Sequence, residues 1–473
     1  MRDNNPMEFE YTSVLPFDVS RVYGYLTAPR AQVRVAPPFQ KVNYIARHGS
    51  PQNQGTVEMW LKERFLPRLK WTLRFKKAEP SKDGEAAAIV TEQETGPFKV
   101  WTLEETLEPH EKQTRLVSKA YYDMPLGRVG RWLNAWEIKR NLEGVFNHRH
   151  QQMAMDLAMA QHYKSEPLHV AISGTGGMVG SQLAAVLQAL GHKVYPLVRH
   201  EPDERQNEIL WNPDAQELDR EALEGMDAII HLAGEPIVKR WTKTQKNYLL
   251  KNREQGTRLL TEAIALLREK PKVFMAASAI GYYGHRPAET LNESSPQGEG
   301  FPAEVTGTIE GVVKKLATAA PEVRCVSLRS GLILNRRGGA LARMLPAFTM
   351  GVGGPLGNGE QVVSWISLQD AVAAIYHILM TPTMNGPVNL TAPKPVTNRH
   401  FSKALGRCLY RPAVCTMPTW AVKILFGEMG EELLLGSTYA LPEKLQMSGF
   451  RFTFSDIQPA LSWEVKGHLE PSS

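Results

Sequence analysis

The feature that most constrains this chain is a glycine-rich turn near its middle, His169-Val-Ala-Ile-Ser-Gly-Thr-Gly-Gly-Met-Val-Gly180. An apolar run enters the turn, glycines stand at 174, 177 and 180, and an amphipathic stretch, 181–190, leaves it. The next apolar run, 193–198, supplies a second strand, so the segment predicts a strand–turn–helix–strand unit. In such a unit a pyrophosphate can approach the backbone N–H groups at the helix N-terminus. A dinucleotide is therefore the first ligand to expect.

Residues 168–390 continue the alternation of strand-like and helical segments. Apolar runs predict strands at 227–234, which ends in small residues, and at 272–278 and 324–329. Between them, helical patterns cover 252–267 and 309–319. This order predicts an α/β fold with a doubly wound parallel sheet and helices on both of its faces.

The residues before the turn follow a different pattern. Residues 8–125 alternate strand-like runs with turn clusters. A short helical stretch near 19–27 follows the first run, 9–14, and 133–163 has the pattern of one long helix. This pattern predicts an antiparallel sheet closed by a helix, a compact α+β layout. With a linker at 161–167, we expect three domains, namely 1–163, 164–390 and a small, mostly helical 391–473.

Composition excludes several classes of protein. The chain of 473 residues is 42% hydrophobic and 22% charged, as globular proteins are, and its net charge of +6 is mild. It has no Lys/Arg run typical of nucleic-acid binding, no stretch near ~18 apolar residues, and no apolar N-terminal leader. Its three cysteines lack metal-ligand spacing. We expect a soluble cytoplasmic protein with no membrane span, no nucleic-acid partner and no metal.

The end of the second strand indicates which dinucleotide binds. An NAD site usually places Asp or Glu there to hold the ribose 2′-OH, whereas this chain has Val198, Arg199 and His200. The guanidinium of Arg199 suits a 2′-phosphate, because it can form charge-assisted hydrogen bonds with it. The sequence therefore predicts NADP, and a solvated surface arginine stays open as the alternative.

Several motifs now give a resemblance to a known family. Four segments follow the order seen in extended short-chain dehydrogenases/reductases, which have a Rossmann-like fold: Gly174–Gly180, His231–Gly234, Ser278–Gly284 and Leu328–Leu334. The chain looks closer still to the atypical epimerase-family branch, related to short-chain dehydrogenase/reductase family 39U, through Gly234–Trp241, Trp365–Asp370 and Gly449–Phe452. Some members are labelled cell-division inhibitors, a label that follows from no residue here.

The resemblance implies a set of cofactor contacts on the glycine turn and on the ends of the neighbouring strands. They are Gly174, Thr175, Gly177, Met178, Val179, Gly180, Arg199, Leu232, Ala233, Gly234, Ser330 and Gly331.

Residues 8–160 resemble the START-like (SRPBCC) helix-grip domain fused to some members, through Arg34–Pro38, Gly96–Phe98 and Tyr122–Gly127. That resemblance implies an apolar cavity between a sheet and the long helix. Candidates for its lining are Met124, Leu126, Trp132, Trp136 and Phe146. The same spacing also fits a plain hydrophobic core.

The chain departs from the superfamily at its catalytic positions. Phe301 and Val305 occupy the positions of the tyrosine and the lysine in the usual Tyr-x-x-x-Lys motif. The tyrosine that donates the proton and the lysine that lowers the pKa of that tyrosine are therefore both missing. Ala279 occupies the usual serine position, one residue after Ser278. We expect Ser278, Tyr282 and Tyr283 to be the catalytic substitutes. Packing roles for the two tyrosines stay open.

Two functions remain compatible with these residues. The first is an NADP-dependent oxidoreductase or epimerase that acts on an apolar small molecule. The alternative is a non-catalytic module that binds NADP(H) and a hydrophobic ligand as a sensor or structural element. Val362 and Val363 stand where nucleotide-sugar enzymes place a diphosphate-binding arginine, which argues against such a substrate. We expect Asp370 to be the N-cap of the helix that follows it.

Overall fold

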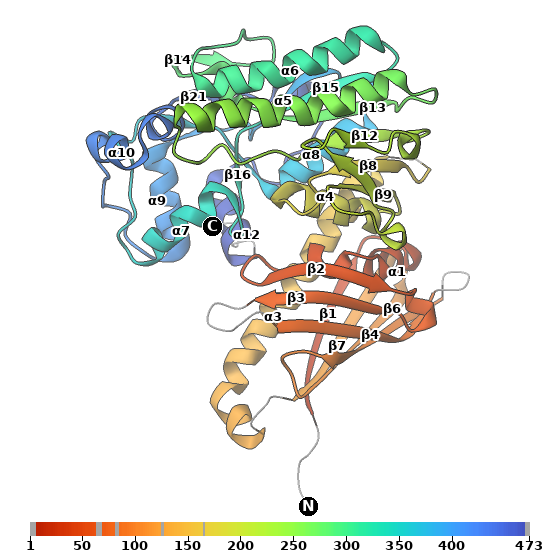
Figure 1. Ribbon diagram of the computed structural model, residues 1–473. Helices are drawn as coiled ribbons and strands as arrows, with labels where there is room; N and C mark the ends of the chain where they lie inside the picture. The colour runs from red at the N-terminus through yellow and green to blue at the C-terminus, as the bar shows by residue number, and fades with distance from the viewer. Residues whose placement is uncertain (1–5, 63–68, 81–84, 124–126, 164–165, 469–473) are drawn as a thin grey trace, which may run out of the picture. The chain divides into compact units, whose positions relative to one another are not determined.

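The computed structural model describes residues 6–62, 69–80, 85–123, 127–163 and 166–468 (Figure 1). The chain forms two compact units, residues 1–165 with 184–192, and residues 166–183 with 193–473. Each unit has its own sheet. Across the residues described, no helix has the length and apolarity needed to cross a bilayer.

The first unit is built on one antiparallel sheet of seven strands, in the order β1-β7-β6-β5-β4-β3-β2. Along β6 buried and partly exposed residues alternate, as expected for a sheet that covers a core with one face. The strands are β1 (Met7–Leu15), β2 (Lys41–His48), β3 (Thr56–Lys62), β4 (Leu69–Glu79), β5 (Ala87–Thr95), β6 (Val100–His110) and β7 (Gln113–Asp123). The antiparallel sheet expected from the sequence is confirmed.

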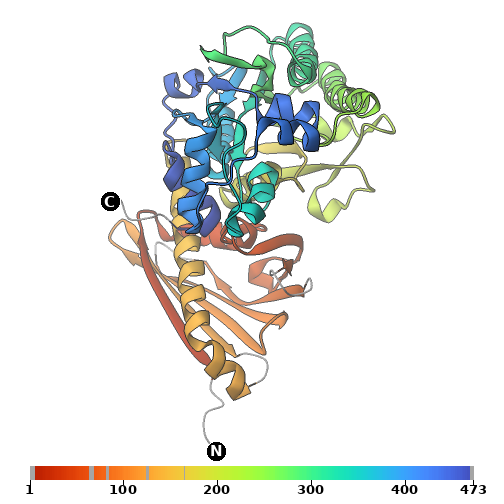
Figure 2. The ribbon, with the colours of Figure 1, turned by 90° about the vertical axis from the view of Figure 1, so that its left-hand side faces the viewer.

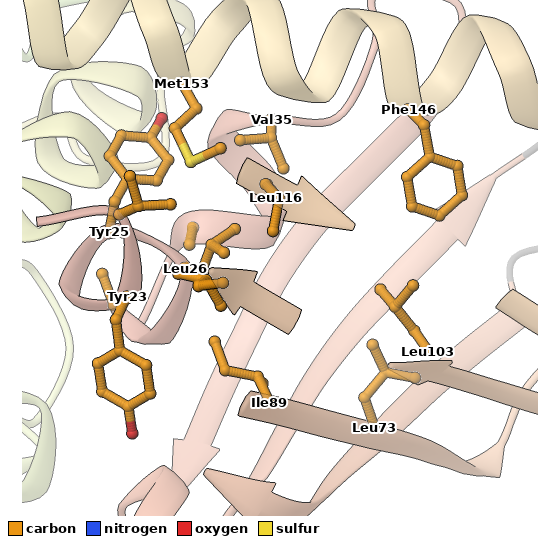
Figure 3. Close-up of a cluster of buried hydrophobic side chains, with 14 of the residues drawn as sticks. Tyr23, Tyr25, Leu26, Val35, Leu73, Ile89, Leu103, Leu116, Phe146 and Met153 are labelled. Carbon is orange, nitrogen blue, oxygen red and sulfur yellow. The ribbon is translucent and has the colours of Figure 1, made fainter. Parts of the chain in front are cut away.

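Helices α1 (Val19–Thr27) and α2 (Ala31–Arg34) connect β1 to β2, and α3 (Gly127–Gln161) follows β7. Figure 2 shows α3 lying against this sheet. In Figure 3, Phe146 points from α3 toward Leu103 and Leu73, and Met153 points from the same helix toward Val35 and Leu116. The long helix confirms the sequence prediction. Met124 and Leu126 lie outside the described residues, as do the side chains of Trp132 and Trp136.

A buried ion pair fixes the short helices to α3. Asp156 of α3 accepts hydrogen bonds from Arg34 Nε at 2.7 Å and Nη2 at 2.6 Å, and from the Tyr25 hydroxyl at 2.7 Å. Both charges are almost fully buried. Their bidentate geometry compensates the desolvation that isolated buried charges would suffer.

The second unit contains an eight-stranded sheet in the order β11-β10-β9-β8-β12-β13-β15-β19. All neighbours pair in parallel except β10 and β11. The strands are β8 (His169–Ser173), β9 (Lys193–Val198), β10 (Ile209–Asn212), β11 (Glu217–Leu218), β12 (Ala228–His231), β13 (Val273–Ala279), β15 (Arg324–Ser330) and β19 (Gly386–Leu390). The strand order reverses at β8, as in a Rossmann fold, so the predicted parallel sheet is confirmed.

Helices cover both faces of this sheet. Figure 1 shows α5 (Lys243–Leu266) and α6 (Phe301–Ala319) side by side on one face and α8 (Leu368–Met380) on the other. Helix α5 begins earlier than the sequence pattern indicated, because the Thr242 side chain caps it by accepting from Gln245 N at 3.2 Å. Helix α4 (Met178–Ala189) begins inside the glycine turn.

The C-terminal residues are mostly helical, as expected, with α9 (Asn398–Leu409), α10 (Thr419–Phe426), α11 (Glu443–Met447), α12 (Ile457–Lys466) and a π-helical turn (Gly430–Leu434). The prediction for Asp370 was wrong. Ser367 is the N-cap of α8, and its hydroxyl accepts from Asp370 N at 2.9 Å. The buried Asp370 carboxylate instead accepts from the backbone N–H groups of Thr453 at 2.7 Å and Phe454 at 3.0 Å. It thereby anchors the segment before α12.

Candidate functional site

The turn between β8 and α4 is built for close approach of a ligand to the backbone. Gly174 has φ +79, and a Cβ there would lie 2.8 Å from Ala233 N. A Cβ on Gly180 would lie 2.2 Å from Gly174 O, and one on Gly177 would lie 3.1 Å from the same atom. Thr175, Met178 and Val179 are partly exposed beside them. The first N–H groups of α4 therefore face an open edge of the sheet.

A buried hydrogen-bonded pair holds the two strands at this edge. Ser173 Oγ lies 2.7 Å from His231 Nδ1 and accepts from Leu232 N and Ala233 N, both at 3.2 Å. Burial, with the positive charge of Arg253 and Arg199, lowers the pKa of His231 to about 3, so the imidazole is neutral. The ends of β8 and β12 are thus fixed side by side at the point where the strand order reverses.

The remaining expected cofactor residues lie along the same edge. Gly234 is exposed, and a Cβ there would lie 2.3 Å from Arg253 Nη1. Ser330 Oγ donates to Ser278 O at 3.1 Å, and Gly331 N donates to Leu390 O at 3.0 Å, which joins the ends of β13, β15 and β19. Because the carboxyl ends of parallel strands meet at one edge, the structure gathers all of these residues along it.

Arg199 lies exposed at the end of β9, next to β8. Its guanidinium is 3.4 Å from Asp214 Oδ2, and its Cζ lies 5.7 Å from the centre of the Trp211 ring. An exposed ion pair of this kind contributes ~0–1 kcal/mol. An anion of higher charge can therefore displace Asp214 at little cost.

Ser278 belongs to a polar cluster under α6. Its hydroxyl donates to Glu310 Oε1 at 2.8 Å. Arg329 holds the same carboxylate with two hydrogen bonds, from Nε at 2.8 Å and from Nη2 at 2.7 Å. Ser278 pairs with Arg329 across β13 and β15, so both side chains point toward Glu310 of α6.

The two tyrosines after β13 are placed differently. Tyr283 is fully buried, accepts from Arg329 Nη1 at 2.9 Å and donates to Asn389 Oδ1 at 2.7 Å. Burial raises the pKa of Tyr283. Tyr282 is only partly buried, and the Arg329 Cζ lies 3.6 Å from the centre of its ring. Of the two, Tyr282 is the one with access to solvent.

Comparison with known proteins gives the family. The model of the NAD dependent epimerase/dehydratase family matches residues 170–390, and that of a domain of unknown function (DUF1731) matches residues 417–464. "Epimerase family protein ML0860" of Mycobacterium leprae is 38% identical over 295 residues, which are 62% of this chain and 94% of that protein. The chain belongs to the epimerase family.

Two solved structures extend this result. The nucleoside-diphosphate sugar epimerase from Corynebacterium glutamicum is 26% identical with a TM-score of 0.76, and the match covers 98% of this chain and 91% of that one. Human epimerase family protein SDR39U1 (isoform 2), crystallised with NADPH, is 29% identical with a TM-score of 0.57, and the match covers 63% of this chain and 99% of that one. The resemblance to extended short-chain dehydrogenases/reductases of this family is confirmed.

In this epimerase-family chain, the positions of the missing Tyr-x-x-x-Lys are part of an apolar cluster. Phe301 and Val305 are buried, and the Phe301 ring packs at 4.8 Å against Trp241. Trp241 Nε1 donates to Ile237 O at 2.9 Å, so this tryptophan belongs to the core. Glu235 and Lys239 form an ion pair with each other on the adjoining loop.

The sequence analysis missed Glu310 and Arg329, which connect Ser278 to Tyr283, and Asn389, which accepts from the Tyr283 hydroxyl. Arg329 carried a signal, because it is a charged residue at the end of the predicted strand 324–329 and a buried arginine requires an acidic partner. Nothing in the sequence pointed to Glu310 as that partner. Among the described residues, no three His, Cys, Asp or Glu side chains gather as a metal site.

The first unit of this family member contains a cavity of about 440 Å³ between its sheet and α3. Its lining comes from α2, α3 and the strands, and includes Trp71, Leu73, Phe98, Trp101, Leu103 and Phe146. Phe146 is therefore a lining residue, as the sequence suggested.

Proposed function

We propose that this chain binds NADP(H) at the β8–α4 turn and acts as an NADP-dependent oxidoreductase or epimerase on a small molecule. The observation that carries this proposal is the turn itself, since a Cβ at Gly180 would collide with Gly174 O at 2.2 Å. A backbone cradle of this kind suits a pyrophosphate. The human relative crystallised with NADPH supports the same cofactor.

In this proposal the bound cofactor supplies the hydride acceptor or donor, and its pyrophosphate would sit on Thr175, Met178 and Val179 above Gly174, Gly177 and Gly180. Leu232, Ala233 and Gly234, with Ser330 and Gly331, would line the rest of the cofactor site. The guanidinium of Arg199 would release the Asp214 carboxylate and bind the 2′-phosphate of the cofactor in its place.

The chain's own proton chemistry is assigned to Tyr282. Its hydroxyl, at a partly exposed position, would give a proton to a substrate oxygen or take one from it. Arg329 holds the Tyr282 ring from one face. Ser278 would orient the substrate, with its hydroxyl positioned by Glu310, and Tyr283 would position Arg329.

The cofactor assignment is tested by thermal melting with NADPH, NADH or neither. Mass action predicts stabilisation by ~2.7 kcal/mol at a hundredfold excess over the dissociation constant. NADPH should stabilise the protein more than NADH, and Arg199→Ala should remove that preference. Arg205→Ala, which changes an exposed arginine near Arg199, is the matched control and should keep it. Persistence of the preference in Arg199→Ala would refute the 2′-phosphate assignment.

The catalytic assignment is tested with Tyr282→Phe and Tyr283→Phe. Tyr282→Phe should lower turnover about 10²-fold or more with little change in stability. Tyr283→Phe should mainly lower the melting temperature, because it leaves Arg329 and Asn389 without one partner.

A non-catalytic module is the second candidate, and the packed Phe301–Val305 region favours it. It predicts tight NADPH binding without oxidation of NADPH by any carbonyl compound. Stereospecific oxidation of bound NADPH in a substrate panel would eliminate it.

We also propose that residues 1–163 are a helix-grip domain of the START-like type, followed by domains at 164–390 and 391–473. Its cavity would hold an apolar substrate or ligand. The name of the Corynebacterium glutamicum relative makes a nucleotide sugar the competing substrate class. Val362 and Val363 offer no charge for a diphosphate, so the panel should contain both apolar ketones and UDP-sugars.

A further inference from the structure

The second unit exposes a row of large apolar side chains, which we call the apolar ridge. It follows the end of α7 (Gly339–Thr349), the connection between α9 and α10, and α10 itself, which lie on the same side of this unit in Figure 1. Six of α10's eight residues are apolar, yet only Val422 is buried, and every residue of this helix is described. Apolar surface of this extent marks an interaction site. The ridge consists of Met350, Tyr410, Val414, Trp420, Ile424 and Leu425, each at least 60% exposed.

Hydrogen bonds hold the segments of the apolar ridge against one another. Arg411 Nε donates to Thr349 O at 3.1 Å, which joins the end of α9 to the end of α7. Further along the same connection, Gly357 N donates to Met417 O at 2.8 Å. Helix α10 begins two residues later, at Thr419. The apolar side chains of the ridge therefore lie on adjoining segments and are not scattered over the surface.

The charge beside the apolar ridge has a single sign. From residue 371 to residue 427 the chain contains no Asp or Glu but six Lys or Arg. Three of these, Arg399, Lys403 and Arg407, are spaced four residues apart and form an exposed stripe along α9. All residues of α9 are described, and the one other exposed residue is His400. Helix α9 thus presents a cationic stripe that leads directly to the ridge.

Most of this positive charge is available to a partner. Arg399 is paired with a glutamate, but within the described part of the chain Lys403 and Arg407 have no carboxylate at ion-pair distance. The acidic residues that follow α10, Glu428 and Glu431, are each already paired with a lysine. The stripe therefore complements an anionic surface.

Cations beside projecting apolar side chains fit the surface of an anionic bilayer. Trp, Ile and Leu bury themselves at the boundary of headgroups and acyl chains, while Lys and Arg are attracted to anionic headgroups. Because α10 has eight residues and a span needs ~20, the contact would be interfacial.

Two other occupants fit this surface less well. A two-fold contact between copies of the chain would bring the same cationic stripe from both copies together, and like charges oppose that. A nucleic acid would satisfy the cations through its phosphates but would leave Ile424, Leu425 and Val414 without apolar contacts. Charge and apolarity together are satisfied by the lipid surface.

We propose that the apolar ridge and the cationic stripe of α9 dock the second unit on an anionic phospholipid bilayer, with Trp420 and Ile424 inserted among the headgroups. This inference goes beyond the proposed function, because docking requires neither a cofactor nor turnover.

The test mixes the full chain with vesicles of phosphatidylcholine alone, or with about one third phosphatidylserine, and measures bound protein by flotation. Each cation near an anionic surface strengthens binding about fivefold, so Lys403, Arg407 and Arg411 together predict a preference of about 10²-fold for the phosphatidylserine vesicles. Raising NaCl from about 0.1 M to about 1 M should remove most of this preference, because the Debye length falls from ~10 Å to ~3 Å.

The apolar contribution is tested with Trp420→Ala combined with Ile424→Ala, since alanine preserves the helix. This double variant should bind about tenfold more weakly or worse. Tyr248→Ala combined with Leu266→Ala is the matched control, because both side chains are exposed on α5, and it should bind like the unmodified protein. Brominated acyl chains should quench tryptophan fluorescence less in Trp420→Phe than in the unmodified protein, which reports insertion directly.

The electrostatic contribution is tested with Lys403→Gln combined with Arg407→Gln. Binding to the phosphatidylserine vesicles should fall about 25-fold, and binding to phosphatidylcholine should stay the same. Lys314→Gln combined with Lys315→Gln, at two exposed lysines of α6, is the matched control and should keep the preference. Melting midpoints are recorded for every variant. If a double variant fails to fold, the vesicle preference and the salt dependence of the unmodified protein decide.

Equal binding to the two kinds of vesicle, or no binding to either, would overturn the proposal. So would binding that the loss of Trp420 and Ile424 leaves unchanged, which would indicate a polyanion such as a nucleic acid as the partner. Self-association that this double variant abolishes, without vesicle binding, would assign the ridge to a second copy of the chain and overturn the proposal as well. NADPH-dependent melting, recorded separately, tests the proposed function independently of all these outcomes.

Discussion

Glu310→Gln tests whether the polar cluster under α6 holds the candidate site in place. Arg329 is 2% exposed, and within the part of the chain that the structure describes Glu310 is the carboxylate paired with it, through two hydrogen bonds of 2.7 and 2.8 Å. The substitution keeps the side-chain shape and removes the negative charge. It leaves a buried guanidinium without its counter-charge, which costs ~3–5 kcal/mol in comparable buried pairs. We therefore expect the second unit to lose about that much stability.

The assay is urea unfolding at pH 7, followed by a signal from the second unit, because the two units need not unfold in one step. Glu304→Gln is the control, since Glu304 is an exposed carboxylate on the same helix. It should cost less than ~1 kcal/mol. Equal midpoints for the two variants would refute the reasoning, because they would show that Arg329 does not depend on the Glu310 charge.

Three further perturbations follow from the structure. Burial lowers the pKa of His231 from 6.5 to about 3, so the stability contributed by the neutral imidazole is present above pH 6.5 and is lost as the pH falls toward 3. At pH 5 the protein should have lost ~2 kcal/mol, measured as the shift of the unfolding midpoint between pH 7 and 5. This loss should be absent from His231→Asn and kept in His200→Asn. Gly180→Ala should abolish NADPH-dependent melting shifts, whereas Gly311→Ala, where a Cβ meets nothing within 4 Å, should keep them. Asp370→Ala should lower the free energy of unfolding by ~2 kcal/mol or more and speed proteolysis near Thr453. The substitution Asp456→Ala, at an exposed carboxylate, should do neither, and equal cleavage rates in the two variants would contradict the anchoring role of Asp370.

The parallel sheet and the glycine turn could be predicted from the sequence, because both depend on patterns among residues close together in the chain. The alternation of apolar runs and helical stretches does not give the strand order by itself. The order follows from the rule that strands joined by a helix usually lie next to each other in a parallel sheet, and β8, with β9 and β12 as its neighbours, follows this rule. Asp370 was misjudged because its position before a helical pattern resembles a cap. The actual cap, Ser367, lies three residues earlier and its hydroxyl also donates to Asp370 Oδ2 at 3.0 Å, whereas the backbone donors of Thr453 and Phe454 lie more than eighty residues away in the chain. Long-range pairing of this kind leaves no local trace.

The site shows the same division between local and long-range information. Gly174 and Gly180 could be recognised from the sequence because the turn excludes a side chain at both positions, while a Cβ at Gly177 would be tight, at 3.1 Å from Gly174 O. Glu310 and Arg329 are 19 residues apart and meet only after α6 packs on β15, so no spacing rule could pair them.

The loss of the Tyr-x-x-x-Lys pair has a physical consequence for any chemistry at this site. Phe301 and Val305 have become part of an apolar cluster with Trp241, so restoring a tyrosine and a lysine there would bury a hydroxyl and a charge among apolar side chains. The proton donor must then come from elsewhere on the same edge of the sheet. Tyr283 has both of its hydrogen-bonding directions occupied, by Arg329 and Asn389, which leaves Tyr282 as the hydroxyl best placed to exchange a proton with a substrate. If turnover does not require Tyr282, neither of the two tyrosines expected from the sequence can be the proton donor at this edge. A non-catalytic cofactor-binding module then describes the protein better.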